Sequence, residues 1–280
     1  MERMNRFFAS LLVACLVTMG CAAPAAISGD PASRVQALLP ADAILVGEQH
    51  DAPDHQRIHR EVIETLAAGG ALAGVALEMA PRGGSTSGLP TNAAESAVQA
   101  ALHWTDESWP WTTYGPAVMA AVRAGVPVLG ANLPRAGMRT AMAEGELDAL
   151  LPGPALKAQQ QAIRLGHCGK LPESQIAPLT RIQIARDRSM AQTLAGLASP
   201  GKTAVLLAGA GHVDRRLGVP LHLPADLRVK IVALRAGEAP DDARSAPQAD
   251  AVWITSPVPP KDYCAEMARR PAAAPGTSKP

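Results

Sequence analysis

Short apolar runs separated by helical patterns constrain the fold of this chain more than any other feature of its sequence. The first four runs lack the polar alternation of a strand that has one solvated face. Strands that alternate with helices indicate a parallel sheet. We therefore predict an α/β fold with a mostly parallel β-sheet flanked by helices. The predicted strands lie at 43–46, 74–77, 126–129, 203–208, 229–234 and 251–254.

The clearest helical pattern follows the first apolar run. Asp51 can cap this helix, Pro53 suits its first turn, and apolar residues recur at helical spacing until Gly69 and Gly70 end it. A helix in this position is the crossover expected between two parallel strands.

The composition along the chain predicts five parts. The stretch between the third and fourth runs contains no convincing strand and about three helical segments, and the C-terminus is low in hydrophobic bulk. We predict a signal peptide at 1–20, a tether at 21–35, an α/β domain at 36–135 and 200–265, an inserted all-α subdomain at 136–199 and a disordered tail at 266–280.

The N-terminus has the three parts of a secretory leader. Arg3 and Arg6 give a basic start, residues 7–20 are apolar, and Cys21 is followed by small residues. A small residue before a cysteine favours lipidation of that cysteine, and we predict Cys21, with Cys15 as the competing position. We therefore expect export and a lipid anchor, in an outer membrane and facing the periplasm. Ordinary secretion is the alternative.

Two cysteines remain once the leader and the lipidated residue are set aside. In an oxidising compartment, Cys168 and Cys264 form a reasonable disulfide, which would tie the C-terminal part to the middle of the chain. Two free buried thiols are the alternative.

Polar residues follow several predicted strands at the point where each strand ends. Open parallel sheets bind ligands beyond the carboxyl ends of their strands, so we expect Glu48, His50, Glu78 and His212 to meet at one edge. These side chains could cap helices and hold loops. They could also bind a divalent metal in a hydrolase of the esterase or protease type, with Glu48 or Glu78 as the base for a metal-activated water.

The first helix carries a histidine pair. His55 and His59 are four residues apart and so lie on one helical face. This spacing can hold a metal, but for this pair alone we favour a solvated helical face.

Most of the few aromatic residues gather in one short segment. Aromatic residues make up 3% of the chain, and four of the six outside the leader lie within 104–114. We expect a loop before a helix at 117–124, in which the indoles pack and Tyr114 presents its phenol. Such a loop offers a porphyrin apolar walls and an axial donor, because tyrosinate is a known ligand of haem iron. A purely structural aromatic core is the alternative.

Basic residues are concentrated in the predicted insert. Arginine, lysine and histidine are natural partners of propionate carboxylates, although a solvated basic face is also common. The residues are Lys157, Arg164, His167, Lys170, Arg181, Arg186 and Arg188.

A series of motifs, in order, resembles the ChaN-like haem-binding lipoproteins. The series begins with Gly47-Glu48-Gln49-His50-Asp51 and includes Trp111-x-x-Tyr114-x-Pro116. It runs from about residue 42 to 220 and its combined specificity is high. The other motifs are Leu77-Glu78-Met79, Gly125-Val126-Pro127-Val128, Ala131-Asn132-Leu133-Pro134-Arg135, Gly166-His167-Cys168, Ala185-Arg186-Asp187-Arg188, Ala208-Gly209-Ala210-Gly211-His212 and Gly218-Val219-Pro220.

The resemblance implies haem as the cofactor and a role in bacterial haem and iron uptake. In that family, two haems stack between two subunits. A tyrosine of one subunit binds the iron, and a histidine and a lysine of the other bind the propionates. On this resemblance we predict Tyr114 as the ligand rather than Tyr263, because Tyr263 lies outside the matched motifs. For the propionates we predict His167 and Lys170, with Lys157 as a substitute.

Together these patterns predict a haem-binding lipoprotein that dimerises around its ligand, rather than an enzyme. An outer-membrane haem receptor is a possible partner, and the formal net charge of +1 gives no reason to expect nucleic acid. The metal-dependent hydrolase and a purely structural surface protein are the alternatives.

Overall fold

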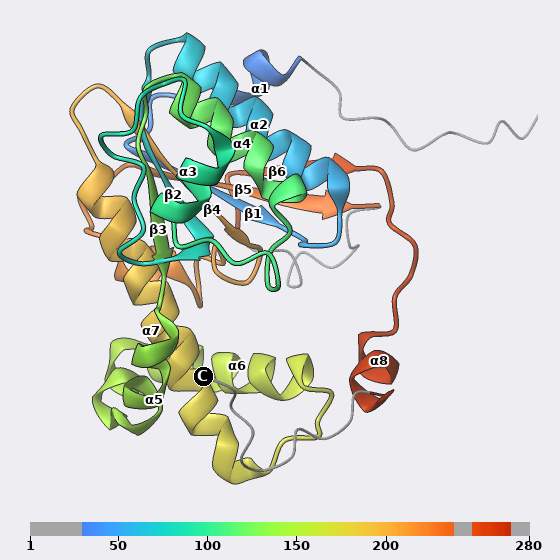
Figure 1. Ribbon diagram of the computed structural model, residues 1–280. Coiled ribbons are helices and arrows are strands. Elements are labelled where there is room, and N and C mark those ends of the chain that lie inside the picture. The colour runs from blue at the N-terminus through green and yellow to red at the C-terminus, as the bar shows by residue number, and fades with distance from the viewer. Residues whose placement is uncertain (1–29, 238–247, 270–280) are drawn as a thin grey trace, which may run out of the picture.

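A six-stranded parallel sheet forms the centre of the structure (Figure 1). The computed structural model describes residues 30–237 and 248–269. The strand order is β3-β2-β4-β1-β5-β6, and every neighbouring pair is parallel. This architecture confirms the predicted fold class. The strands are β1 (Ala43–Glu48), β2 (Leu72–Pro81), β3 (Val128–Asn132), β4 (Thr203–Gly209), β5 (Val229–Ala236) and β6 (Ala251–Thr255).

Both faces of the sheet are buried, which explains why the strand sequences lack polar alternation. Successive side chains of a strand point to opposite faces. In β1, Ile44 and Val46 join one hydrophobic cluster, whereas Ala43 and Leu45 join another. This alternation also decides where the polar residues at the strand ends point.

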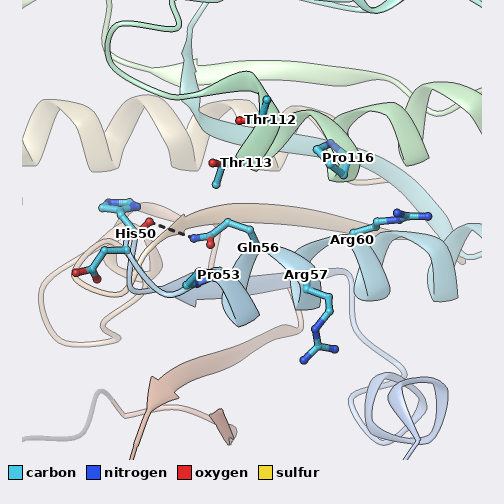
Figure 2. A pocket seen from close by; sticks show the side chains of 9 residues that line it. His50, Pro53, Gln56, Arg57, Arg60, Thr112, Thr113 and Pro116 are labelled. Atoms are coloured by element: carbon cyan, nitrogen blue, oxygen red, sulfur yellow. Dashed lines mark hydrogen bonds between the residues drawn. The ribbon is translucent and has the colours of Figure 1, made fainter. Parts of the chain in front are cut away.

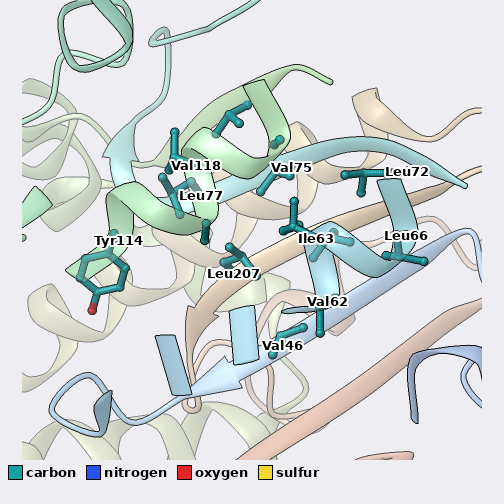
Figure 3. Packing of buried hydrophobic residues seen from close by; sticks show 14 of the residues in the cluster. Val46, Val62, Ile63, Leu66, Leu72, Val75, Leu77, Tyr114, Val118 and Leu207 are labelled. Atoms are coloured by element: carbon teal, nitrogen blue, oxygen red, sulfur yellow. The ribbon is translucent and has the colours of Figure 1, made fainter. Parts of the chain in front are cut away.

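Helices that follow the first strands cover one face of the sheet. α2 (Pro53–Ala68) and α4 (Trp111–Arg123) supply most of the helical side chains of that cluster, and Figure 3 shows Ile63, Leu66 and Val118 packed on strand residues. α3 (Glu95–Ala101) precedes α4. α1 (Pro31–Gln36) is capped by the Asp30 carboxylate, which accepts from the Ser33 amide, and it buries Val35. The end of the predicted tether is therefore an ordered helix.

The segment between β3 and β4 is entirely helical. It contains α5 (Arg135–Ala143), the 3-10 helix η1 (Gly145–Leu150), α6 (Gly153–Gly166) and α7 (Glu173–Leu197). Met190 and Leu194 of α7 pack on the second face of the sheet. The last turns of α7 therefore belong to the α/β layers, while its first half, with α5 and α6, extends below the sheet (Figure 1).

A disulfide and a short helix lie at the C-terminal end of the described chain. Cys168 and Cys264 are bonded, in agreement with the pairing expected from the sequence. α8 (Tyr263–Arg269) occupies part of the region where we predicted a disordered tail, so that prediction is wrong for residues 266–269. The predicted leader with Cys15 and Cys21, most of the tether and the rest of the tail lie outside the described residues. No helix within the described ranges is long and apolar enough to cross a membrane.

Candidate functional site

The carboxyl ends of β1 and β4 frame the candidate site. These strands are neighbours, but the chain leaves them toward opposite faces. α2 follows β1 on one face, and Val213 and Val219, which follow β4, pack with α7 on the other face. Such a divergence opens a crevice at the strand ends, the usual ligand position in an open parallel sheet.

Glu48 at the end of β1 is the centre of a buried polar cluster. Its carboxylate accepts hydrogen bonds from the Tyr114 hydroxyl at 2.8 Å and from the Gln56 amide at 2.6 Å. The Nδ1 atom of His50 lies 2.7 Å from the same carboxylate, and that of His59 lies 3.6 Å from it. Burial alone would raise the pKa of Glu48, but His59, His50 and Tyr114 hold it below its usual value.

His212 is the centre of a second cluster on the other face. It lies 3.3 Å from the Glu78 carboxylate and 2.5 Å from that of Asp187, and Glu78 also accepts from the Gly209 amide. Burial disfavours the imidazolium, but Glu78 and Asp187 raise the pKa of His212 to about 10. Burial alone would also raise the pKa of Glu78, but the neighbouring His212 lowers this pKa to about 2. Burial raises the pKa of Asp187 to about 6. His212 is therefore a buried cation between two carboxyl groups.

The two clusters meet at a cavity of about 530 Å³. A Cβ atom at Gly209 would lie 2.8 Å from Nε2 of His50, so any larger residue here would displace the imidazole from its present position. The cavity volume lies in the range of small-molecule sites, about 300–1,000 Å³. The lining residues are Glu48, Gln49, His50, Asp51, Gln183, Gly209, Ala210, Gly211, His212, Leu234, Arg235 and Tyr263.

A second cavity of about 500 Å³ adjoins the first between α2 and α4 (Figure 2). His50 and Asp51 line both cavities. Thr113 and Pro116 of α4 face Gln56 of α2 across this cavity. His50 and Asp51 therefore lie where the two hollows approach each other.

The four residues of the predicted metal site do not form one. Within residues 30–237 and 248–269, no group of three histidine, cysteine or acidic side chains is arranged to hold a metal ion. The pleat of the strands gives the reason, because Glu48 points toward the α2 and α4 face and Glu78 toward the α7 face. His50 and His212 are each engaged with the carboxylate of their own cluster. The geometry thus gives no support to the metal-dependent hydrolase.

The histidine pair of α2 is buried, contrary to the solvated face that we favoured. His55 and His59 are 0% and 1% exposed. Nδ1 of His55 accepts from the Gln49 amide, and Nε2 lies 3.1 Å from the Thr255 hydroxyl. Burial lowers the pKa of His55 to about 4, so the imidazole is neutral. It fixes the loop after β1 to the end of β6.

Tyr114 lies in a helix, not in the loop that we expected. α4 begins at Trp111, whose backbone amide donates to the Asp106 carboxylate at 2.7 Å. The Tyr114 side chain is buried beside Val118 (Figure 3), and its hydroxyl donates to Glu48. Burial and this carboxylate raise the pKa of Tyr114 far above its usual value. The Tyr114 phenol is therefore buried in the protein interior and hydrogen-bonded there.

The aromatic residues around Tyr114 also pack on one another. The ring centroids of Trp104 and Trp111 are 5.1 Å apart, and those of Trp109 and Tyr114 are 5.7 Å apart. Two indoles are anchored, because Trp104 donates to the Trp109 carbonyl and Trp111 donates to Glu95. Two contacts connect this cluster to residues that line the cavity: the edge contact between Trp109 and His50, at 4.8 Å, and the hydrogen bond from Tyr114 to Glu48.

The other tyrosine, Tyr263, lies on the cavity wall. Its side chain is 50% exposed, and its hydroxyl donates a hydrogen bond to Asp51. This hydrogen bond raises the pKa of Tyr263 to about 12. The ammonium group of Lys261 lies 5.1 Å from the ring centroid. The Tyr263 side chain is thus exposed at the surface, whereas the Tyr114 side chain is buried.

The disulfide brings the predicted propionate ligands toward Tyr263. Cys264 is bonded to Cys168, and His167 and Lys170 flank Cys168 in the same loop. His167 is half-buried, with Nδ1 2.8 Å from the Ile163 carbonyl, and Lys170 is exposed. The disulfide therefore links the loop that carries these two residues to the helix that carries Tyr263, whereas Tyr114 is buried in the core.

The sequence matches a known family over most of this architecture. Residues 34–223 match the model of the haem-binding uptake proteins of the Tiki superfamily, ChaN. The chain belongs to this family. The matched segment includes Glu48, Glu78, Tyr114 and His212, but it ends before Tyr263.

Two solved structures are similar to this chain, and the first of them shows the same fold. ChaN of Campylobacter jejuni, whose structure is described as showing cofacial haem binding, is 24% identical with a TM-score of 0.60, over 77% of this chain and 89% of that chain. The type III effector HopBA1 is 15% identical with a TM-score of 0.46, over 83% of this chain and 96% of that chain. No curated protein sequence matches this chain.

The sequence analysis chose Tyr114 over Tyr263, although two observations pointed to Tyr263. The chain has two tyrosines, and Tyr263 is the direct neighbour of Cys264, one of the two predicted disulfide partners. The expected disulfide would have placed Tyr263 beside the His167 and Lys170 loop. The motif around Tyr114 carried more weight because it lies within the family segment.

Proposed function

We propose that this protein binds haem at the carboxyl edge of its sheet, as part of bacterial haem and iron uptake. Membership of the haem-binding uptake family supports haem as the ligand. The structural observation that carries the proposal is the half-exposed phenol of Tyr263 on the wall of a cavity of ligand size.

The residues of the cavity suit a haem group. Tyr263 offers the phenol oxygen that can bind ferric iron. Ala210 contributes apolar surface, and Arg235 also lines the cavity. Basic side chains are suitable partners for propionate carboxylates. Bound haem would supply a ferric centre, and this chain's own groups would hold and orient it.

The proposal assigns the iron ligand to Tyr263 rather than to Tyr114. Binding iron through Tyr114 would require loss of its hydrogen bond to Glu48 and opening of the packed cluster around it. Binding through Tyr263 requires that its hydroxyl, which donates to Asp51, loses its proton, and no packed side chain has to move.

We also propose that the complex is a dimer. A cavity open on one side leaves the second face of a flat ligand exposed, and two copies related by a two-fold axis cover both ligands. In this arrangement His167 and Lys170 of one subunit would bind the propionates of the haem held by the other. The cofacial haem of the C. jejuni protein supports this arrangement. The lipid anchor at Cys21 and a position in the outer membrane remain part of the proposal.

Titration with hemin tests the function. The mature protein, purified without haem, is titrated while absorption and sedimentation are followed. We expect saturation at one haem per chain, a high-spin tyrosinate spectrum, and conversion of monomer to dimer on loading. Spectra that stay those of free hemin, with no saturation, would contradict haem binding. Saturation without a change in sedimentation would refute only the dimer.

A further inference from the structure

The helix that carries Tyr263 has almost no hydrophobic attachment to the rest of the protein. α8 buries none of its residues, and the segment that leads to it from β6 is mostly exposed. Burial of apolar surface is the main force that docks a helix on a domain. α8 must therefore be held by something else.

Two specific links hold α8 in place. One is the hydrogen bond from Tyr263 to Asp51, and the other is the Cys168–Cys264 disulfide. An exposed hydrogen bond contributes little by itself, because water competes for both partners. The disulfide joins residues 96 positions apart and is attached to the residue next to Tyr263. It is thus the strongest restraint on the position of the phenol.

We propose that the Cys168–Cys264 disulfide positions Tyr263 for haem capture, so that this protein acquires its binding site only when it is oxidised. This inference rests on the proposed haem-binding function. With the disulfide open, Tyr263 is attached only through the mostly exposed segment after β6. The effective concentration of the phenol at the cavity, and with it the affinity for haem, then falls.

The redox step is a simple thiol oxidation. The two thiols lose two protons and two electrons, two S–H bonds break and one S–S bond forms. The electrons pass to a thiol–disulfide oxidant of the kind present in oxidising compartments. In a reducing compartment the thiols persist, and the chain would not sequester haem before export. The same crosslink joins the loop of His167 and Lys170 to the helix that carries Tyr263.

The test compares the crosslinked and the opened protein without free thiol reagents. One sample of wild type is oxidised. A second is reduced, alkylated with iodoacetamide and freed of reductant, and a third is the Cys168→Ser, Cys264→Ser variant. All three are also prepared with Tyr263→Phe. Hydrogen exchange of residues 256–269 is measured on the haem-free proteins, and hemin affinity and absorption spectra are measured afterwards.

We expect faster exchange in α8 and hemin affinity lower by roughly 100-fold in both opened forms, the size of a lost tethering effect. Their tyrosinate band should be weaker at a hemin concentration that saturates the crosslinked protein, and opening the disulfide should cause no further loss in the Tyr263→Phe background. Equal affinity and equal spectra of the crosslinked and opened proteins would overturn the inference and leave haem binding intact. The inference would also be overturned if opening the disulfide lowered hemin affinity as much in the Tyr263→Phe protein as in wild type, because the disulfide would then act through another group. If the oxidised wild type fails to bind hemin, the proposed function and the inference both fail.

Discussion

Replacing Tyr263 with phenylalanine abolishes the tyrosinate spectrum of the haem complex and weakens hemin binding by at least about 100-fold. Loss of an outer partner of a metal ligand typically costs about 10–100-fold in affinity, so loss of the ligand itself costs more. The substitution removes one exposed hydroxyl, and we expect stability to change by less than about 0.5 kcal/mol. Absorption spectra and hemin titration at neutral pH measure the effect.

Tyr114→Phe is the matched control. It removes the hydrogen bond to the buried Glu48 carboxylate and should cost about 1.5–3 kcal/mol of unfolding free energy. The hemin spectrum should stay the same. If instead Tyr114→Phe loses the tyrosinate band while Tyr263→Phe keeps it, the assignment to Tyr263 is wrong and the motif-based prediction is right.

Replacing His212 with alanine should destabilise the protein by about 3–5 kcal/mol, the usual cost of leaving a buried charge without its partner. In the native protein His212 lies between Glu78 and Asp187, both of which are buried. Urea unfolding at pH 7 measures the loss. The double substitution Glu78→Gln, His212→Gln should cost less than the sum of the two single substitutions, because each alone leaves a partner uncompensated.

The same cluster predicts how stability depends on pH. Glu78 and Asp187 raise the pKa of His212 from its usual 6.5 to about 10 against the effect of burial. Its stabilising contribution is therefore complete below pH 6.5 and is lost as the pH rises through 10. Wild type should lose more stability than His212→Ala between pH 7 and pH 10. Parallel pH profiles for the two proteins would show that His212 is not held as a cation.

The fold was predictable because its strands are buried on both faces. Each of the six predicted runs lies within, or overlaps, an observed strand, and Gly69 ends α2 as expected. Apolar runs could not predict where β2 and β3 end. Both strands continue into polar residues, Glu78 in β2 and Asn132 in β3.

The site was predictable only in part, because the sequence does not specify which face a side chain occupies at a strand end. The gathering of Glu48, His50 and His212 at one edge follows from parallel topology alone. Glu48 and Glu78 are separated because their side chains point to opposite faces of the sheet, and this depends on which residues of each strand face which side. The burial of Tyr114 depends on α4 starting at Trp111, whose backbone amide donates to the Asp106 carboxylate. The position of Tyr263 depends on a disulfide between distant parts of the chain.

The crystal structure of the haem-loaded, oxidised protein would test the central claim most directly. We predict haem at the carboxyl edge of the sheet, with the Tyr263 oxygen bound to iron and Tyr114 still donating to Glu48. Iron bound to Tyr114, or haem seated away from β1 and β4, would contradict this account.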